Sequence, residues 1–274
     1  MSDTALSLDL LLEKEARLKT ILTEYGAVAV AYSGGVDSTY LADVSHEALG
    51  EKAVMVLADS PSIPRAEVAE AMSIARERGW NLHVVRTREF ENEDYLKNDG
   101  NRCYFCKSEL FEKMREFALS NEVGVLAYGA ITDDLLDQTR VGHKAAQEYA
   151  VVAPLQEAQL SKTEVRALSR RRKLSTADKA SFACLASRFP KGTRVSVSEV
   201  EKVEKAEEVL RAEGFHQFRA RHHGDICRVE IDPRDFGRLL DPETRDRIVQ
   251  AIRAAGYRFV ALDLAGYRTG STAG

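Results

Sequence analysis

The stretch Ala27–Ser38, AVAVAYSGGVDS, decides the fold of this 274-residue chain. Its first part, residues 27–32, is a short apolar run with the length of a buried parallel strand. A glycine turn, SGGVDS, follows at residues 33–38, and apolar residues then recur at helical spacing. Two glycines let backbone N–H groups approach an anion closely, and a helix N-terminus adds partial positive charge. The order strand, glycine turn, helix therefore predicts a phosphate site, to which the hydroxyls of Ser33 and Ser38 add donors.

The turn lacks the Gly-Lys-Ser/Thr ending of a Walker phosphate loop. It resembles the PP-loop of the ATP pyrophosphatase superfamily, whose members cleave ATP between the α and β phosphates and adenylate a carbonyl or carboxylate. The resemblance implies that Ser33, Gly34, Gly35 and Ser38 hold the departing pyrophosphate and that Asp37 places Mg²⁺ against it. The alternatives are a glycine turn without a ligand and, for Asp37, a carboxylate that only stabilises the turn.

Strands and helices alternate along the first two thirds of the chain. Further apolar runs with the length of buried strands stand at residues 53–58, 82–85, 125–130 and 151–153. Helical spacing covers residues 65–77 and 103–117, and Ser161 with Glu164 predicts a capping box that opens a helix to about Lys173. This alternation predicts an open parallel α/β sheet with helices on both faces and a ligand site at the carboxyl ends of the strands.

The pattern changes around Pro190. The expected elements beyond it are helices at 196–213 and 242–255, two antiparallel strands at 218–222 and 226–231, and a strand at 259–262. We therefore expect two domains. Residues 1–193 form the domain of the phosphate loop, and residues 194–274 form a small α+β domain for substrate binding or oligomerisation, with a frayed end at 269–274.

Composition excludes several classes of function. The formal net charge of −4 argues against a strongly basic nucleic-acid binder. No apolar run approaches about 18 residues, so no membrane span is expected. The first 20 residues lack a basic region followed by an apolar one, which argues against a secretory signal. We expect a cytoplasmic protein that acts on a small molecule, with neither nucleic acid nor membrane as a partner.

The cysteines favour metal binding or catalysis over disulfides in such a chain. Cys103 and Cys106 have the CxxC spacing that places two thiolates at one metal site, and Cys184 offers a third. Two buried apolar cysteines and a zinc site completed by Cys227 are the alternatives. Cys227 itself alternates with apolar neighbours in ICRVEI and fits an ordinary strand position.

Three further stretches resemble one branch of the superfamily: NRCYFCK at 101–107, GAITDDLLDQTR at 129–140 and CLASRFP at 184–190. Together with SGGVDS and the ending ALDLAGYRTG, they are similar to the LarE family of sulfurtransferases over nearly the whole chain. The resemblance implies a homo-oligomeric enzyme that uses ATP and Mg²⁺ to adenylate a carboxylate of pyridinium-3,5-biscarboxylic acid mononucleotide. Sulfur then yields a thiocarboxylate of the nickel-pincer nucleotide that serves lactate racemase. Activation is needed because an acyl adenylate has AMP as a leaving group, whereas a carboxylate is a poor acyl donor.

The source of the sulfur differs among relatives. The best-known branch gives up the sulfur of a protein cysteine, and Ala183 stands at that position here. Other relatives hold a [4Fe–4S] cluster on three cysteines, with the fourth iron open to an extra sulfide. The resemblance therefore implies a cluster on Cys103, Cys106 and Cys184, and a sacrificial Cys184 is the alternative.

Residues beside these motifs complete the expected nucleotide site. Ser60 ends the second strand, whereas Lys107, Ser187 and Arg188 flank the cysteines. We expect all four to contact ATP, with surface ion pairs as the alternative for the two cations.

Acidic and basic residues elsewhere have two interpretations each. Asp133 and Asp134 end a strand on the ligand side, where they would bind Mg²⁺ or cap a helix. Arg219 and Arg221 share one strand face by period 2. Both arginines, and also Glu207, match residues in the region of LarE that binds the substrate phosphate. The alternative is that all three only form a solvated polar face. The basic run 170–173 complements a helix dipole, or binds an anion or RNA.

Three other functions compete with the LarE hypothesis. A tRNA-thiolating PP-loop enzyme would need a basic surface, which the net charge disfavours. An amidotransferase-type synthetase shares the SGG-x-DS loop and has no use for three clustered cysteines. A non-catalytic nucleotide sensor would not release pyrophosphate.

Overall fold

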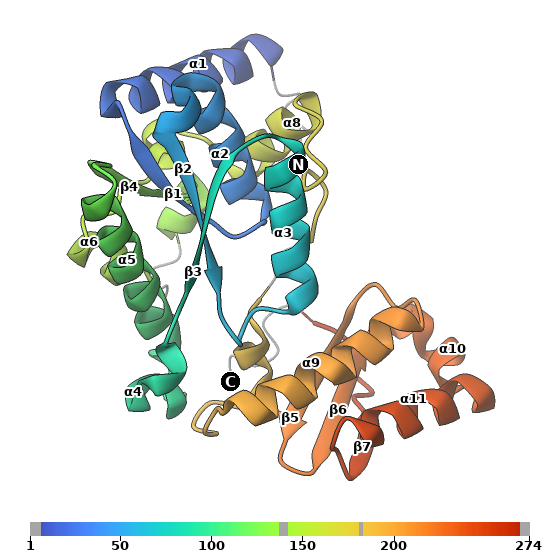
Figure 1. Ribbon diagram of the computed structural model, residues 1–274. Coiled ribbons are helices and arrows are strands. Elements are labelled where there is room, and N and C mark those ends of the chain that lie inside the picture. The colour runs from blue at the N-terminus through green and yellow to red at the C-terminus, as the bar shows by residue number, and fades with distance from the viewer. Residues whose placement is uncertain (1–6, 137–141, 181–182, 269–274) are drawn as a thin grey trace. The chain divides into compact units, whose positions relative to one another are not determined.

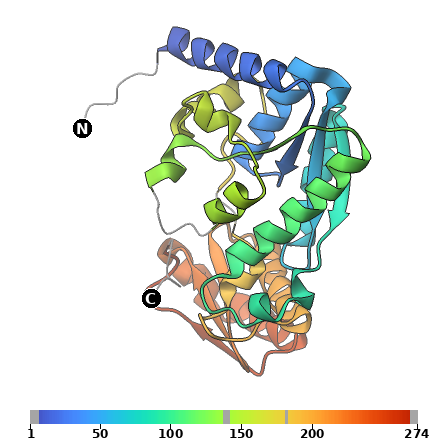
Figure 2. The same cartoon turned by 90° about the vertical axis from the view of Figure 1, so that its left-hand side faces the viewer.

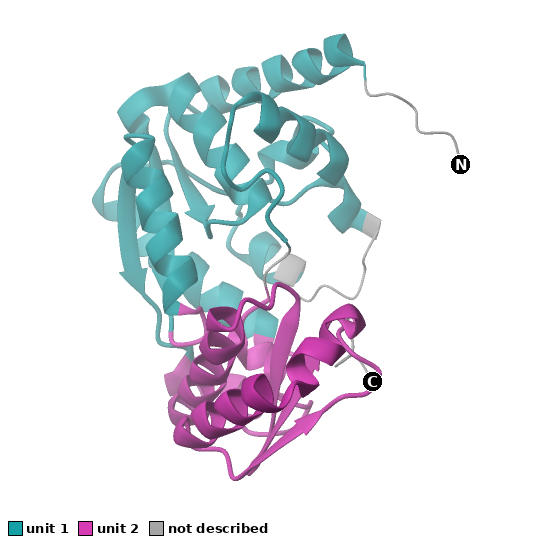
Figure 3. Ribbon diagram, turned by 90° about the vertical axis from the view of Figure 1, so that its right-hand side faces the viewer, with its two compact units in different colours: residues 1–60, 65–89, 103–182 teal, residues 61–64, 90–102, 183–274 magenta. Residues whose placement is uncertain are grey.

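The computed structural model describes residues 7–136, 142–180 and 183–268, which form two compact units (Figures 1 and 3). Unit 1 comprises residues 1–60, 65–89 and 103–182, and unit 2 comprises residues 61–64, 90–102 and 183–274. The domain boundary expected at residue 194 stays a prediction. The expected fraying at 269–274 lies outside the described residues, as do Ser181, Phe182 and residues 137–140 of the GAITDDLLDQTR stretch.

Four parallel strands form the sheet of unit 1, in the order β3-β2-β1-β4. β1 (Val28–Tyr32) lies between β2 (Ala53–Asp59) and β4 (Val125–Tyr128), and β3 (Asn81–Arg86) takes the edge beside β2. The predicted parallel α/β fold is therefore confirmed, with strand ends close to those expected.

The fifth strand expected at 151–153 is a single bridge. The N–H of Val152 donates to Leu126 O at 2.8 Å, and its carbonyl accepts the N–H of Tyr128 at 3.0 Å. Helix α7 (Pro154–Glu157) begins two residues later, because Pro154 has no N–H to extend the ladder and suits the first turn of a helix.

Helices cover both faces of this sheet (Figures 1 and 2). Alternate strand residues point to opposite faces. On one face α5 (Arg102–Ser120) and α6 (Gly142–Glu148) pack against β1, β2 and β4. On the other face lie α2 (Val36–Leu49) and α3 (Arg65–Glu77), where the hydroxyl of Tyr32 donates to Ala71 O at 3.1 Å.

Two further helices pack against α2, namely α1 (Leu8–Tyr25) and α8 (Lys162–Arg171). Arg172 at the end of α8 pairs with Glu15 of α1 and with Asp43 and Glu47 of α2. The side chain of Arg172 is only 15% exposed. This member of the basic run therefore ties three helices together inside unit 1.

Unit 2 is a three-stranded sheet covered by helices on one face. β5 (Phe218–His223) and β6 (Ile226–Ile231) are antiparallel as predicted, and β7 (Phe259–Leu262) runs parallel to β6. α9 (Val197–Ala212) and α11 (Pro242–Ala254) bury the apolar face. Cys227 is in this core, where burial raises the pKa of its thiol to about 12, so it is a structural cysteine.

Short elements complete the two units. They are η1 (Gly50–Lys52), η2 (Glu89–Glu91), α4 (Glu93–Leu96), η3 (Thr132–Leu136), η4 (Leu185–Arg188), η5 (Pro233–Asp235) and α10 (Phe236–Leu240). Within the described ranges, no helix combines the length and the apolar character that crossing a bilayer requires.

Candidate active site

The glycine turn stands where β1 ends and α2 begins. Gly34 has φ +69°, and a Cβ at this position would lie 2.8 Å from the Cβ of Ala71 in α3. Only glycine fits this close approach without strain. The Oγ of Ser38 accepts the N–H of Ser33 at 3.2 Å and lies 3.0 Å from the Oγ of Ser33. The loop is therefore closed by its own two serines at the start of α2.

A second glycine brings the end of β4 to the same loop. A Cβ on Gly129, directly after β4, would lie 2.9 Å from the N of Ser38 and 3.1 Å from the carbonyl carbon of Asp37. Both atoms belong to the backbone of α2, which cannot move aside as a flexible side chain does. The carboxyl end of β4 therefore packs directly on the first turn of α2.

Replacing Gly129 with Ala is expected to lower the free energy of unfolding by about 1–3 kcal/mol, because the methyl group overpacks this contact. Urea unfolding followed by circular dichroism measures the change. Gly124→Ala is the matched control at the other end of β4, where a Cβ would meet nothing within 4 Å. Equal losses for the two variants would show that β4 does not press on the loop.

A lysine that the sequence analysis did not single out lies at the loop. The Nζ of Lys162 lies 2.9 Å and 2.7 Å from the two carboxylate oxygens of Asp37. Burial raises the pKa of Asp37, and the hydrogen bond and charge of Lys162 act in the opposite direction. Lys162 is the first residue of α8, and the predicted capping box between Ser161 and Glu164 is formed. Its place directly after the N-cap Ser161 is the sequence signal that could have found it.

Lys179 is a second cation at the loop that sequence reasoning missed. Its Nζ pairs with Glu67 at 2.7 Å and Glu70 at 2.8 Å, both on α3, and donates to Gly34 O at 3.3 Å. It begins the stretch KASFAC at residues 179–184, of which the sequence analysis considered only Ala183 and Cys184. Two ammonium groups therefore contact the residues of the phosphate loop.

The two aspartates after β4 act as caps. The Oδ2 of Asp133 accepts the N–H of Lys162 at 2.9 Å, and the Oδ2 of Asp134 accepts the N–H of Ile131 at 3.0 Å. Asp133 thereby fixes the first turn of α8 next to the loop. This geometry favours the capping interpretation of both residues.

Other expected residues lie at the same edge of the sheet. Ser60 directly follows β2 and is buried, with its hydroxyl donating to Glu89. The Nζ of Lys107 lies 5.3 Å from the ring centroid of Tyr128, the last residue of β4. Because the strands are parallel, their carboxyl ends share one edge. Unit 1 therefore gathers the loop, Ser60 and Lys107 at this edge.

Two of the expected cluster ligands are in the first turn of α5. Cys103 is exposed and Cys106 is partly exposed. Three residues apart on a helix, they share one face. Among the residues that the structure describes, no group of three or more His, Cys, Asp or Glu side chains is arranged to hold a metal ion. The three-cysteine site stays a prediction.

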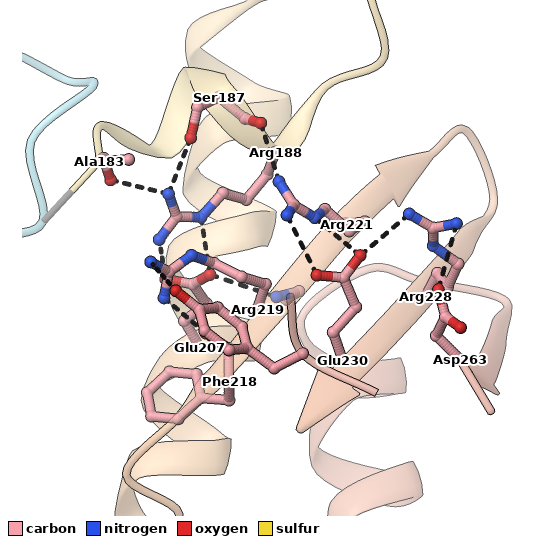
Figure 4. A network of polar contacts seen from close by, with 12 residues as sticks. Ala183, Ser187, Arg188, Glu207, Phe218, Arg219, Arg221, Arg228, Glu230 and Asp263 are labelled. Carbon is pink, nitrogen blue, oxygen red and sulfur yellow. Dashed lines mark hydrogen bonds and ion pairs between the residues drawn. The ribbon is translucent and has the colours of Figure 1, made fainter. Parts of the chain in front are cut away.

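In unit 2, the third cysteine stands four residues before Arg188, which forms a buried ion pair with Glu207 (Figure 4). Arg188, 1% exposed, makes a two-pronged pair with Glu207 at 2.8 and 3.0 Å. Its Nη1 also donates to the carbonyls of Ala183 at 2.7 Å and Cys184 at 3.1 Å and to the Oγ of Ser187 at 2.8 Å. The guanidinium therefore fixes the backbone at Cys184, whose side chain is partly exposed.

The face of the unit 2 sheet opposite its helices is charged. Arg221 pairs with the buried Glu230 at 3.0 and 3.1 Å and donates to Ser187 O at 3.1 Å, and Arg228 shares Glu230 (Figure 4). Arg219 differs, because its Nη1 donates to Phe218 O at 2.7 Å and its guanidinium stacks on a tyrosine ring.

Arg219 also differs from Arg221 and Arg228 in the charges around it. In the described part of the chain, no carboxylate lies within 4.0 Å of its guanidinium. Burial, together with the charge of nearby Arg188, lowers the pKa of Arg219. An incoming phosphate would relieve this unfavourable electrostatic environment. Glu207, by contrast, uses its carboxylate for Arg188 and accepts the N–H of Ala220 at 3.2 Å. A contact from Glu207 to substrate stays a prediction.

Known proteins resemble this chain along nearly its whole length. An uncharacterized protein of Synechocystis is 38% identical over 257 residues, which cover 94% of this chain and 96% of the relative. The pyridinium-3,5-bisthiocarboxylic acid mononucleotide synthase of Lactiplantibacillus plantarum is 34% identical over 259 residues, 94% of this chain and 92% of that enzyme. The chain belongs to the LarE family.

The likeness to LarE spans both units, whereas a second likeness spans one part of the chain. A component of the glutamine-hydrolyzing GMP synthase of Methanopyrus kandleri is 29% identical over 153 residues, 52% of this chain and 48% of that relative. No family model matches the chain. The extent of the two likenesses therefore favours LarE over the synthetase alternative.

Proposed function

We propose that this chain is an ATP-dependent sulfurtransferase that converts a carboxylate of pyridinium-3,5-biscarboxylic acid mononucleotide into a thiocarboxylate. The observation that carries the proposal is the similarity to the L. plantarum synthase along 94% of the chain. The glycine loop with two lysines at its residues supports the use of ATP.

The first step is adenylation of the carboxylate. A carboxylate oxygen attacks the α-phosphorus of ATP, the bond to the bridging oxygen breaks, and pyrophosphate leaves with the electron pair. Negative charge grows on the leaving group. The loop backbone at 33–38 and the Lys162 ammonium stabilise this charge where it develops.

Asp37 is the residue that would hold Mg²⁺. Its carboxylate already binds a cation, because both of its oxygens contact the Lys162 ammonium. A bound Mg²⁺ would supply charge neutralisation for the phosphates. With Mg²⁺ on Asp37, the Lys162 ammonium would be available to the pyrophosphate oxygens.

The second step places sulfur on the carbonyl carbon and expels AMP. Cys103, Cys106 and Cys184 would hold a [4Fe–4S] cluster, and the accessibility of all three fits a thiolate ligand set. Such a cluster would supply an iron that is open to an extra sulfide. Arg188 keeps the Cys184 backbone in place during the transfer through its contacts with two carbonyls.

Arg219 would bind the phosphate of the pyridinium nucleotide. Arg219→Ala is expected to raise the apparent KM for this substrate about 10- to 100-fold, the value of one charged hydrogen bond, while the KM for ATP changes little. Steady-state pyrophosphate release with each ligand varied in turn measures both constants. Arg234→Ala, which removes a surface arginine of the same unit, is the control. A parallel rise of both constants would place Arg219 outside the substrate site.

The proposed function is tested directly on protein purified without oxygen. The protein is incubated with ATP, Mg²⁺, sulfide and pyridinium-3,5-biscarboxylic acid mononucleotide, and pyrophosphate and the thiocarboxylate are quantified by mass spectrometry. We expect pyrophosphate release that requires the pyridinium substrate, and a product in which sulfur replaces oxygen. Pyrophosphate release that requires tRNA or xanthosine monophosphate instead would replace the proposal with one of its competitors.

A further inference from the structure

Helix α1 contacts the N-terminus of α8, next to the lysine that lies at the phosphate loop. The Nζ of Lys14, on α1, lies 2.6 Å from the Oε1 of Glu164 and 2.6 Å from Gln159 O. The other oxygen of Glu164 accepts the N–H of Ser161 at 2.8 Å and its hydroxyl at 2.9 Å. A continuous set of contacts therefore runs from α1 to the residue that precedes Lys162.

The turn before α8 needs this support. Gln159 adopts φ +58°, a left-handed conformation that non-glycine residues rarely take. Its carbonyl is one of the two groups that Lys14 holds, and the next carbonyl, of Leu160, accepts the N–H of Thr132 at 3.0 Å. The turn is thus fixed from α1 on one side and from η3, which follows β4, on the other.

Three backbone donors at the start of α8 are already used. The N–H of Ser161 goes to Glu164, that of Lys162 to Asp133, and that of Glu164 to the Oγ of Ser161. These amides are not available for a phosphate in this arrangement. What α8 offers to the nucleotide is the ammonium of Lys162.

We infer that Lys14 is a positioning residue of the nucleotide site. It orients Glu164, which fixes the first turn of α8 and thereby holds the Lys162 ammonium at the phosphate loop. The inference rests on the proposed use of ATP, and it assigns to α1 a role in that site.

The environment of Glu164 explains why one lysine matters. Glu164 is 5% exposed, and burial alone would raise its pKa. Hydrogen bonds from Lys14 and Ser161 outweigh burial and hold the pKa below its ordinary value. Without Lys14, a buried carboxylate loses its cation, so Glu164 turns toward water or takes up a proton. Either change weakens the hydrogen bonds that Glu164 accepts from Ser161, so the first turn of α8 is held less firmly.

The test compares two lysines of the same helix. Lys14→Met is expected to raise the Kd for ATP with Mg²⁺ about tenfold, since a small displacement of a phosphate-binding group is costly. Affinity for the pyridinium nucleotide is expected to stay within about twofold. Lys19→Met is the control, because Lys19 pairs with Glu47 of α2 and its replacement removes the same charge from α1. Isothermal titration calorimetry gives the affinities, and thermal unfolding gives the stability of each variant.

A second variant separates positioning from loss of stability. Glu164→Gln keeps the shape of the side chain and is expected to weaken ATP binding as much as Lys14→Met. The double variant is expected to be no worse than either single one, because both interrupt the same set of contacts. Lys14→Arg, which keeps the charge and the donors, is expected to restore most of the affinity.

The outcomes distinguish the inference from the proposed function. Wild-type protein that binds no ATP would overturn both. ATP binding by the wild type that is equally strong in Lys14→Met, or equally weakened in Lys19→Met, would overturn the role of Lys14 alone. Additive effects of Lys14→Met and Glu164→Gln would do the same.

Discussion

Asp37→Ala is expected to lower ATP-dependent pyrophosphate release by about 10²- to 10³-fold, and Lys162→Met by a similar factor. A preorganised group that meets developing charge typically contributes this much. Asp37 and Lys162 contact each other at 2.7 Å at the start of α2, where pyrophosphate would leave. Release of pyrophosphate is measured with a coupled phosphate assay at saturating pyridinium substrate.

The control for this pair is Glu47→Ala, which removes an acid from the last turn of the same helix, α2. Glu47 is about half exposed and pairs with Lys19 and with Arg172, and Arg172 keeps Glu15 and Asp43 as partners without it. Its removal is therefore expected to leave the rate within about twofold. Circular dichroism confirms that the variants are folded. Undiminished pyrophosphate release in both loop variants would refute the assignment of the glycine turn to ATP.

Sulfur transfer is expected to fall by about 100-fold or more in each of three variants, Cys103→Ser, Cys106→Ser and Cys184→Ser, while pyrophosphate release continues. The reason is that removal of one thiolate ligand destroys an iron–sulfur cluster, whereas adenylation needs only the phosphate site. Protein purified without oxygen should be brown, and each variant should lose its visible absorption and its iron. Cys227→Ala, in the core of unit 2, should keep both.

Mass spectrometry of the protein after reaction decides between a cluster and a sacrificed cysteine. A chain of unchanged mass that turns over repeatedly when sulfide is supplied supports the cluster. A loss of about 34 Da at Cys184 would contradict the cluster mechanism, because a cysteine loses the mass of H₂S when it becomes dehydroalanine. That outcome would also limit each chain to one sulfur atom.

Local patterns predicted the framework of unit 1 because they act over a few residues. The strand, turn and helix of Ala27–Ser38 and the capping box of Ser161 and Glu164 are set by neighbours in sequence. The bridge at Val152 was expected as a strand, since a short apolar run looks the same in a strand and in a bridge and only Pro154 shortens it.

Local sequence patterns could not predict which side chains distant in sequence contact each other in the fold. Lys162 meets Asp37 across 125 residues, and Lys179 meets Gly34 across 145. In unit 2, period 2 correctly placed Arg219 and Arg221 on one strand face. It did not show that Arg221 is buried against Glu230, because burial of that face depends on β6 and η4, which the strand pattern does not contain.

The way Arg188 holds its neighbours bears on how sulfur chemistry evolves in this family. Arg188 donates to the main-chain carbonyls of residues 183 and 184. Every residue has a main-chain carbonyl. The hydrogen bonds from Arg188 therefore do not depend on whether alanine or cysteine stands at each of the two positions. A lineage can thus gain or lose a sulfur-bearing side chain there by substitution at one position without losing these contacts. The side chains at these two positions can therefore change while the backbone keeps its hydrogen bonds to Arg188.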